Sequence, residues 1–308
     1  MTTEFNLDGF DSPVPVTIHP GASSRTLTKE HVLGFKGFAD WKAQLGNSLR
    51  IQHTDKEHTF YGKPASLKSV EIQSVDWFGP NVGFMKTKPV IVSDDGREIP
   101  GICFLRGGSV AVLIILRPRD AREERMVVMT EQPRVPAGSL SFMEIPAGML
   151  DTSDNFAGKA AKEIEEEVGL KIPHSELLDL TQLALSKATR NPEGLLDAMY
   201  PSPGGSDEFI TIYLWEKELD RQEIEDLRGK LTGIKTQGEM ITLRLIEYEA
   251  LWRECARDAK TLAAWALYEG LNRDGTLKRS LKRQLTGLSS DGTTEEMPTA
   301  RGRRRFQK

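Results

Sequence analysis

The stretch from Gly148 to Leu170 reads GMLDTSDNFAGKAAKEIEEEVGL and carries the clearest pattern in the chain. Its second half predicts a helix in which Glu163, Glu166 and Glu167 stand at i, i+3 and i+4, so that their carboxylates share one face. A separate face is apolar and has the same helical period, through Ala157, Ala161, Ile164 and Val168. Like charges this close repel one another, so a cation is the expected compensation. Hard carboxylate oxygens suit Mg²⁺ or Mn²⁺.

The same stretch resembles the Nudix box, which has the form G, five residues, E, seven residues, R-E-hydrophobic-x-E-E-x-G-hydrophobic. The positions that match in register are Gly148, Glu163, Ile164, Glu166, Glu167, Gly169 and Leu170. The chain departs from the box at Asp154, which replaces the first Glu, and at Lys162, which replaces the Arg. An acidic run on a helix is usually only a solvated face. The glycines at both ends, the loop length and the hydrophobic positions favour the family resemblance instead.

The resemblance implies hydrolysis of a diphosphate linked to a nucleoside, with a divalent metal held at the box helix. It implies that Glu163 and Glu167 are direct metal ligands. Glu166 is then a further or water-mediated ligand with a catalytic part, and the carbonyl of Ala147 is a backbone ligand. Mg²⁺ keeps several waters, so a few carboxylates and the substrate phosphates are sufficient. Lys162 offers a point charge where the family has a guanidinium fork, so it should hold its carboxylate less rigidly without abolishing activity.

Segments on both sides of the box narrow the resemblance to the ADP-sugar diphosphatase branch, closest to its plant members. They are TEQPR at 130–134, EIPAGM at 144–149 and PSPGGSDE at 201–208. The similarity extends over about residues 70 to 270. It implies ADP-ribose or ADP-glucose as the substrate and AMP with a sugar phosphate as the products. It also implies homodimers in which the N-terminal domain of one subunit reaches over the active site of the other. UDP-sugars and other nucleoside diphosphate compounds remain open as substrates.

Candidate substrate contacts lie in and near these segments: Arg134, Glu131, Trp77, Ser206 and Glu208. A guanidinium fork suits phosphate and ribose oxygens, which favours Arg134. The Ser-Pro-Gly-Gly segment is an ordinary turn by composition, yet its amides and Ser206 would suit a sugar or phosphate oxygen. Trp77 is a candidate to stack on adenine together with Phe78, with packing in the core as the alternative.

The candidate general base is Glu239, which precedes an expected strand at 241–246. The branch that the chain resembles carries a Glu in the corresponding loop, where it is thought to orient or deprotonate the attacking water. A loop Glu is more commonly just solvated, and this is the competing interpretation. Glu239 and Glu166 are therefore the catalytic candidates.

Composition describes an ordinary globular chain of 308 residues, with 38% hydrophobic and 28% charged side chains. No apolar run approaches the roughly 20 residues that a membrane span needs. Cys103 and Cys255 are too few for a disulfide framework, which favours a reducing compartment. No targeting peptide is visible, so we expect a cytoplasmic protein without a membrane partner.

The net charge of the chain is −4, and the charged residues are distributed unevenly along the sequence. Residues 297–308 contain only basic charges, at Arg301, Arg303, Arg304, Arg305 and Lys308. The rest of the chain is therefore more acidic than the net value suggests, and nucleic-acid binding is not expected. The basic tail would also suit nuclear localisation.

Strands that alternate with helices predict an α/β protein: a Nudix-type α/β/α sandwich with a mixed sheet, preceded by a smaller, mostly β N-terminal domain. The expected division is a flexible N-terminal arm over 1–29, a β-rich dimerisation domain over 30–105, a Nudix hydrolase domain with a C-terminal helix over 106–285, and a disordered basic tail over 286–308. Strands are expected at 70–75, 89–92, 101–105, 110–116, 126–132, 178–185, 209–215 and 241–246. Helices are expected at 36–45, 155–168, 221–231 and 249–271.

Functions of other classes also remain open. A catalytically weakened Nudix domain that only binds a nucleotide would account for the altered box, but its retained box carboxylates would then have no use. Alternatively, the N-terminal domain and the basic tail form an interaction module in which hydrolysis is incidental. Removing the tail and measuring turnover separates that reading from an enzyme.

Overall fold

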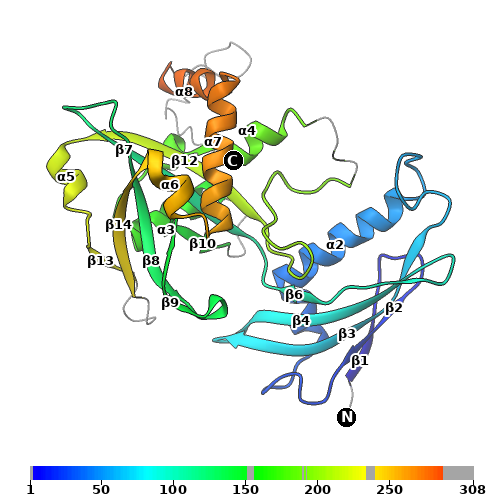
Figure 1. The fold of residues 1–308 in the computed structure, drawn as a ribbon. Helices are drawn as coiled ribbons and strands as arrows, with labels where there is room; N and C mark the ends of the chain where they lie inside the picture. The colour runs from blue at the N-terminus through cyan, green and yellow to red at the C-terminus, as the bar shows by residue number, and fades with distance from the viewer. Residues whose placement is uncertain (1–2, 151–155, 189–190, 192, 234–239, 287–308) are drawn as a thin grey trace, which may run out of the picture.

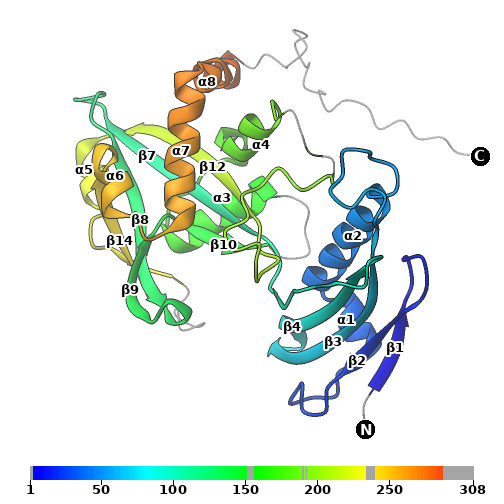
Figure 2. The same ribbon diagram turned by 45° about the vertical axis from the view of Figure 1, so that its right-hand side comes forward.

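The computed structural model describes residues 3–150, 156–188, 191, 193–233 and 240–286. Figures 1 and 2 show two β-sheets, each with helices packed beside it. The N-terminal sheet has the order β1-β2-β3-β4-β5, with β6 also paired to β4. Its strands are β1 (Thr3–Leu7), β2 (Val14–Ile18), β3 (Ala65–Phe78), β4 (Asn81–Ser93), β5 (Glu98–Ile99) and β6 (Cys103–Leu105). Helices α1 (Lys29–Gly34) and α2 (Lys36–Ile51) connect the parallel pair β2 and β3.

Residues 3–18 differ from the irregular arm that the sequence suggested for residues 1–29. Leu7, Val14 and Val16 are buried in the core of the N-terminal sheet, against Phe38 of α2. Apolar residues alternate along β2, with Pro15 at an exposed position between Val14 and Val16, but the Pro, Ser, Thr and Gly content of this region favoured an irregular arm. This proline is tolerated because it precedes the residues of β2 that pair with β3.

The strand expected at 89–92 is the end of the longer strand β4, and Pro89 lies inside it. On one side of β4, the pairing with β6 ends at Thr87 and the pairing with β5 begins at Ile91. Pro89 falls between these two paired segments. That edge therefore lacks a neighbouring strand at the proline, where a missing N–H costs no ladder hydrogen bond.

The second sheet is mixed and has the order β11-β12-β7-β8-β14-β13, with β10 also paired to β7 and β9 to β8. Its strands are β7 (Ser109–Pro118), β8 (Met126–Arg134), β9 (Ser139–Glu144), β10 (Ala147–Met149), β11 (Leu178–Asp179), β12 (Ile210–Leu219), β13 (Leu231–Thr232) and β14 (Ile241–Glu247). Its helices are α3 (Phe156–Glu167), α4 (Leu180–Leu185), α5 (Arg221–Glu225), α6 (Tyr248–Glu254), α7 (Ala259–Arg273) and α8 (Thr276–Thr286), with 3₁₀ turns at Val135–Ala137 and His174–Glu176.

Strand β7 is buried on both faces, as its continuous apolar sequence predicts. Alternate residues face opposite layers. Val110, Val112, Ile114 and Leu116 pack with Ala160, Ile164 and Val168 of the α3 segment. Ala111, Leu113 and Ile115 pack with Ala264, Tyr268 and Leu271 of α7. Figures 1 and 2 show α3 and α7 on the two sides of this sheet. The predicted α/β/α arrangement with a mixed sheet is therefore confirmed.

Three element predictions were wrong in the second half of the chain. Residues 178–185 form the short strand β11 and then helix α4, because the Asp179 carboxylate accepts a hydrogen bond from the Gln182 N–H and caps the helix. The helix expected over 249–271 is divided into α6 and α7. Asp258 caps the second helix by accepting a hydrogen bond from the Thr261 N–H. Helix α5 is also shorter than the expected 221–231.

Candidate active site

Ser109, at the start of β7, lies between the two segments that the sequence singled out. It pairs with Met149 of β10 on one side and with Ile210 of β12 on the other. Neighbouring strands are about 4.8 Å apart, so Met149, at the start of the box, and Ile210, after the Ser-Pro-Gly-Gly turn, lie about 10 Å apart. The fold thus brings these motifs together at one edge of the sheet, although roughly 60 residues separate them in the sequence.

Ser206 and Glu208 are both bound within the chain at this edge. The Ser206 hydroxyl donates to the carbonyl of Phe104 at 3.1 Å and accepts from the Glu208 N–H at 3.2 Å. The Glu208 carboxylate accepts from the Ser109 hydroxyl at 3.2 Å and lies 3.2 Å from the Arg106 guanidinium. These contacts hold the segment against β6 and the start of β7. Substrate contacts by Ser206 and Glu208 stay predictions.

Asp207 is a structural residue that the sequence did not identify. Its carboxylate accepts hydrogen bonds from the backbone N–H groups of Arg106 at 2.8 Å and Gly107 at 3.0 Å. Burial raises the pKa of Asp207, and these backbone donors act in the opposite direction. Arg106 and Gly107 join β6 of the first sheet to β7 of the second, so Asp207 fixes this junction beside the candidate site. Only its place after a Gly-Gly-Ser turn hinted at such a role.

Helix α3 carries the acidic residues of the box. The Glu167 side chain is only 7% exposed, and its carboxylate accepts a hydrogen bond from the Ala147 N–H at 3.1 Å. Glu166 is half-buried and lies 3.4 Å from the ammonium group of Lys162, which is largely exposed. Lys162 thus contacts a box carboxylate as a single exposed cation, and the looser support expected from a lysine stays a prediction.

The described part of this site fits a hard cation. Glu166 and Glu167 supply carboxylate oxygens, and the contact between Glu167 and Ala147 joins α3 to β10. Among the described residues, no group of three or more His, Cys, Asp or Glu is arranged to hold a metal ion. The Glu163 side chain, together with Asp154 and Glu239, falls outside the described residues. The predicted ligand set is therefore only partly described.

Gly169 ends the box helix in a backbone conformation that favours glycine. Its φ is +75°, and its N–H lies 3.1 Å from the carbonyls of both Ile164 and Glu165. We expect Gly169→Ala to destabilise the protein by about 1–2 kcal/mol, because a Cβ is disfavoured in this conformation. Gly270→Ala is the control, since Gly270 is exposed in α7 with open space around it. It should stabilise the helix by about 0.5–1 kcal/mol. Urea unfolding measures both, and equal effects of the two substitutions would contradict this assignment.

Arg134 lies at the end of β8, close to the box. Its Nε is 2.5 Å from a carboxylate oxygen of Glu144, at the end of β9. Glu144 is three residues from Ala147, which limits the distance between their Cα atoms to about 11 Å. The contact between Arg134 and Glu144 therefore lies near the contact between Ala147 and Glu167. Binding of substrate by Arg134 stays a prediction.

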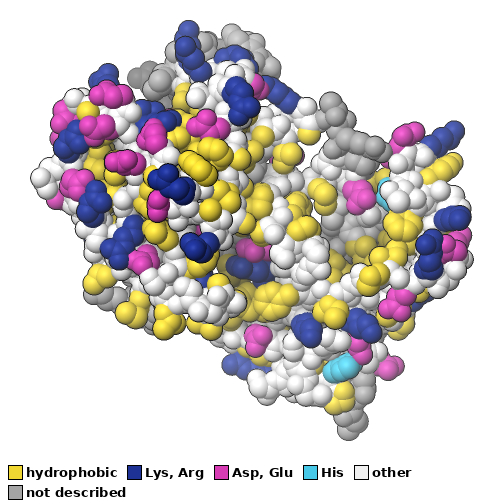
Figure 3. Space-filling view, in the orientation of Figure 1, with side chains coloured by type: hydrophobic (Ala, Val, Ile, Leu, Met, Phe, Trp, Pro, Cys, Tyr) yellow, Lys and Arg dark blue, Asp and Glu magenta, His cyan; other side chains and the backbone are white. Residues whose placement is uncertain are grey.

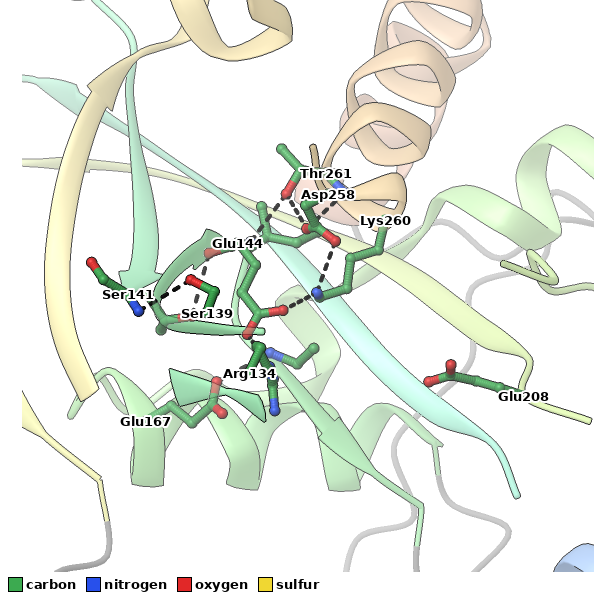
Figure 4. A network of polar contacts seen from close by, with 12 residues as sticks. Arg134, Ser139, Ser141, Glu144, Glu167, Glu208, Asp258, Lys260 and Thr261 are labelled. Atoms are coloured by element: carbon green, nitrogen blue, oxygen red, sulfur yellow. Dashed lines mark hydrogen bonds and ion pairs between the residues drawn. The ribbon is translucent and has the colours of Figure 1, made fainter. Parts of the chain in front are cut away.

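The other oxygen of Glu144 contacts Lys260, in the first turn of α7. Lys260 also lies 3.0 Å from the Asp258 carboxylate, which accepts a hydrogen bond from the Thr261 hydroxyl at 2.5 Å. That hydroxyl in turn accepts from the N–H of Ile145 at 3.1 Å. Figure 4 shows this network joining α7 to β9. No local sequence pattern indicates this network, because Lys260 and Glu144 are distant in sequence and only the capping pattern of Asp258 is local.

Glu131 is engaged within the second sheet. Its carboxylate accepts hydrogen bonds from the Ser141 hydroxyl on β9 and from Arg244 on β14, at 2.6 Å for the Arg244 Nε. The hydrogen bond from Ser141, followed by that from Arg244, lowers the pKa of Glu131. These contacts tie together three neighbouring strands, which gives Glu131 a structural role. Its predicted role in substrate binding has no further support from the fold.

Trp77 belongs to β3 of the N-terminal sheet, where its own subunit surrounds much of the ring. Its Nε1 donates to the Ser23 hydroxyl at 2.7 Å. The Arg25 guanidinium lies 5.4 Å from the ring centre, and the His31 ring meets it edge-on at 5.1 Å. Trp77 is also partly buried against the core of the N-terminal sheet, and stacking of Trp77 on adenine stays a prediction.

Comparison with known proteins places this arrangement in a family. The model for the NUDIX domain matches residues 107–265, about half of the chain. The chain belongs to the Nudix family. The match begins at Gly107, at the junction that Asp207 holds, and includes the box helix and the first residues of α7.

Individual relatives add detail to the family assignment. The chain is 43% identical to Nudix hydrolase 14, chloroplastic, of Arabidopsis thaliana over 212 residues, which cover 68% of this chain and 65% of that protein. It is 30% identical to ADP-ribose pyrophosphatase of Bacillus subtilis (strain 168) over 128 residues, which cover 39% of this chain and 56% of that protein. The chain thus spans less than two thirds of the length of these curated relatives. A solved structure titled "Crystal structure of ADP compounds hydrolase" aligns with a TM-score of 0.43 and 15% identity, covering 68% of this chain and 96% of that chain.

Proposed function

We propose that this Nudix protein hydrolyses the diphosphate bond of ADP-sugars, namely ADP-ribose and ADP-glucose, to AMP and a sugar phosphate with Mg²⁺ as the cofactor. The observation that carries the proposal is the contact between Glu167 on the box helix and Ala147 of β10, near Arg134. The similarity to a protein named ADP-ribose pyrophosphatase supports the choice of substrate class. Mn²⁺ is the alternative metal, and UDP-sugars are the alternative substrates.

Mg²⁺ would be held by Glu163, Glu166, Glu167 and the carbonyl of Ala147, and when bound it would neutralise charge on the diphosphate oxygens. Arg134 adds a guanidinium group for phosphate or ribose oxygens. Glu239 accepts a proton from the attacking water, whose oxygen forms the new bond to phosphorus while the bridging P–O bond breaks. The chain's own residues thus supply orientation and proton transfer.

The substrate assignment is tested with a panel of ADP-ribose, ADP-glucose and UDP-glucose, each with Mg²⁺ or Mn²⁺. Release of AMP or UMP measures turnover, and kcat/KM ranks the substrates. We expect both ADP compounds to exceed UDP-glucose by about tenfold or more. A higher kcat/KM for UDP-glucose would overturn the preference for ADP-sugars while leaving the diphosphatase chemistry in place.

The proposed compartment is the cytoplasm, with the nucleus as the alternative that the basic tail suggests. Within the described residues, no helix combines the length and the apolar character needed to cross a bilayer. The name of the Arabidopsis relative assigns that protein to the chloroplast. The basic tail lies outside the described residues. Imaging of the full-length protein in its own cells tests the compartment.

We also propose a homodimer in which the two subunits complete each other's active sites. Exposed aromatic rings support a partner surface: Phe78 is 50% and Phe104 is 40% exposed, and Phe84 lies 4.8 Å and 5.1 Å from them between ring centres. Figure 3 shows hydrophobic side chains gathered on this face where the two sheets meet. A neighbouring subunit would remove this apolar area from water.

Light scattering at micromolar concentration is expected to show a dimer of the wild-type protein. The double variant Phe78→Glu/Phe104→Glu should be monomeric and should lose activity, because it places charges on the apolar surface. Tyr61→Glu is the matched control: Tyr61 is also exposed, at 44%, but is no part of this aromatic group. It should remain dimeric and active. A fully active wild-type monomer would contradict the composite site.

A further inference from the structure

Arg134, Glu144, Lys260 and Asp258 form a continuous chain of alternating charges beside the candidate active site. The Glu144, Asp258 and Lys260 side chains are 3%, 7% and 11% exposed, whereas that of Arg134 is 40% exposed. Arg134 is thus the exposed end of an otherwise buried chain. Its contact with Glu144 uses Nε, so the N–H donors of its two terminal nitrogens lie outside this contact.

The charges of this network balance as two cations and two carboxylates. Asp258 is compensated on its own side, because it caps the N-terminus of α7, where the backbone N–H groups favour negative charge. Glu144 is compensated by Lys260 and Arg134 together, one cation on each oxygen. When Lys260 is present, only part of the positive charge of Arg134 is required to balance the negative charge of Glu144. Without it, Glu144 would hold the Arg134 guanidinium as its only cation in this network.

We propose that Lys260 is a positioning residue for the diphosphate site. The ammonium group of Lys260 neutralises the Glu144 carboxylate. Glu144 then orients Arg134 without cancelling the positive charge of the guanidinium group. Arg134 therefore keeps a net attraction for the anionic diphosphate. This inference rests on the proposed function, since it assigns the diphosphate as the group that Arg134 meets. Helix α7 thereby contributes to substrate binding although it lies on the opposite face of the sheet from the box helix.

A purely structural role is the competing explanation, because Lys260 also ties α7 to β9. Removing one partner of a buried ion pair leaves an uncompensated charge and commonly destabilises a protein. A structural loss lowers the fraction of correctly folded enzyme, which reduces the apparent kcat and leaves KM unchanged. Loss of positive charge at Arg134 instead weakens substrate binding, which raises KM. The two roles are therefore separable in steady-state kinetics.

The test compares Lys260→Met, Lys260→Gln and Lys260→Arg with ADP-ribose and Mg²⁺. Lys260→Met is expected to raise KM by about tenfold or more, with kcat per folded molecule within about threefold of the wild type. Lys260→Gln keeps a hydrogen-bond donor for Glu144 without the charge, so it should raise KM similarly. Lys260→Arg should restore KM to within about threefold. Lys171→Met, at an exposed lysine beyond α3, removes the same charge elsewhere and should leave KM unchanged.

An unchanged KM in the folded Gln variant overturns the proposal, as does a loss confined to kcat. If Lys260→Met does not fold, the Gln variant decides. Calorimetric binding of ADP-ribose to the wild-type and Gln proteins separates this inference from the proposed function. Without turnover in the wild type, the hydrolase proposal fails. Even in that case, binding of ADP-ribose that is about tenfold weaker in Lys260→Gln than in the wild type supports the role of Lys260. Equal affinities of the two proteins for ADP-ribose reject it.

Discussion

Glu167→Gln is expected to lower the rate of ADP-ribose hydrolysis to below about one hundredth of the wild-type rate. The substitution keeps the shape of the side chain and an oxygen that can accept the hydrogen bond from the Ala147 N–H. It removes the negative charge with which a buried carboxylate would hold a divalent cation. Steady-state AMP release with saturating Mg²⁺ measures the loss. Thermal unfolding without metal should show a melting temperature within a few degrees of the wild type.

The control for this variant is Glu165→Gln on the same helix. The Glu165 side chain is exposed and lies 3.5 Å from Lys171, outside the predicted ligand set. Its rate should stay within about twofold of the wild type, because an exposed ion pair contributes little. Glu163→Gln should show the same loss as Glu167→Gln. If Glu163→Gln and Glu167→Gln both retained more than about a tenth of the wild-type rate, the metal assignment would be refuted.

Glu239→Gln is expected to reduce kcat by roughly 10²–10⁴, the usual contribution of a general base, with little change in substrate affinity. Glu208→Gln is the matched comparison, since it removes a carboxylate from the segment beside the start of β7. Glu208 already accepts a hydrogen bond from Ser109 and lies beside Arg106, so its charge has a structural partner. We expect a smaller loss of rate in this variant.

The pH dependence of kcat/KM identifies the base independently. A carboxylate base acts only when it is deprotonated, so the wild-type rate should fall as the pH decreases through the pKa of that carboxylate. This acidic limb should disappear in Glu239→Gln and persist in Glu208→Gln. The opposite result, with the larger loss and the missing limb in Glu208→Gln, would move the base to the segment after the Ser-Pro-Gly-Gly turn.

The parts of the fold that the sequence predicted correctly are those with local signals. The continuous apolar sequence of β7 predicted a strand buried on both faces, and the apolar period of α3 predicted its packing surface. Residues 178–185 were misassigned because a short apolar run fits a strand and a helix equally, and the cap at Asp179 decided the outcome. Strand β2 was missed because the Pro, Ser, Thr and Gly content around it is typical of irregular chain, although Val14, Val16 and Ile18 alternate with outward-facing residues.

The candidate site likewise contains features that a local sequence pattern predicts and contacts that no local pattern predicts. The box spacing predicted acidic residues on one helix, and the structure adds the contact of Glu167 with Ala147. The contact between Glu144 and Lys260 joins residues 116 positions apart. No local pattern encodes it, because the pairing depends on where α7 packs against the sheet. Sequence reasoning also had no means to show that Trp77 is held by Ser23 and Arg25 of its own chain.

The central claim is that this chain cleaves the diphosphate of ADP-sugars at the Nudix site. Following ADP-ribose by ³¹P NMR with the purified protein tests it most directly. We expect the diphosphate resonances to disappear in the presence of Mg²⁺ while two phosphomonoester resonances grow equally, those of AMP and ribose 5-phosphate. Neither change should occur with metal-stripped protein or with Glu167→Gln. Intact diphosphate resonances after prolonged incubation of the folded wild-type protein with Mg²⁺, or inorganic phosphate as the product, would contradict the claim.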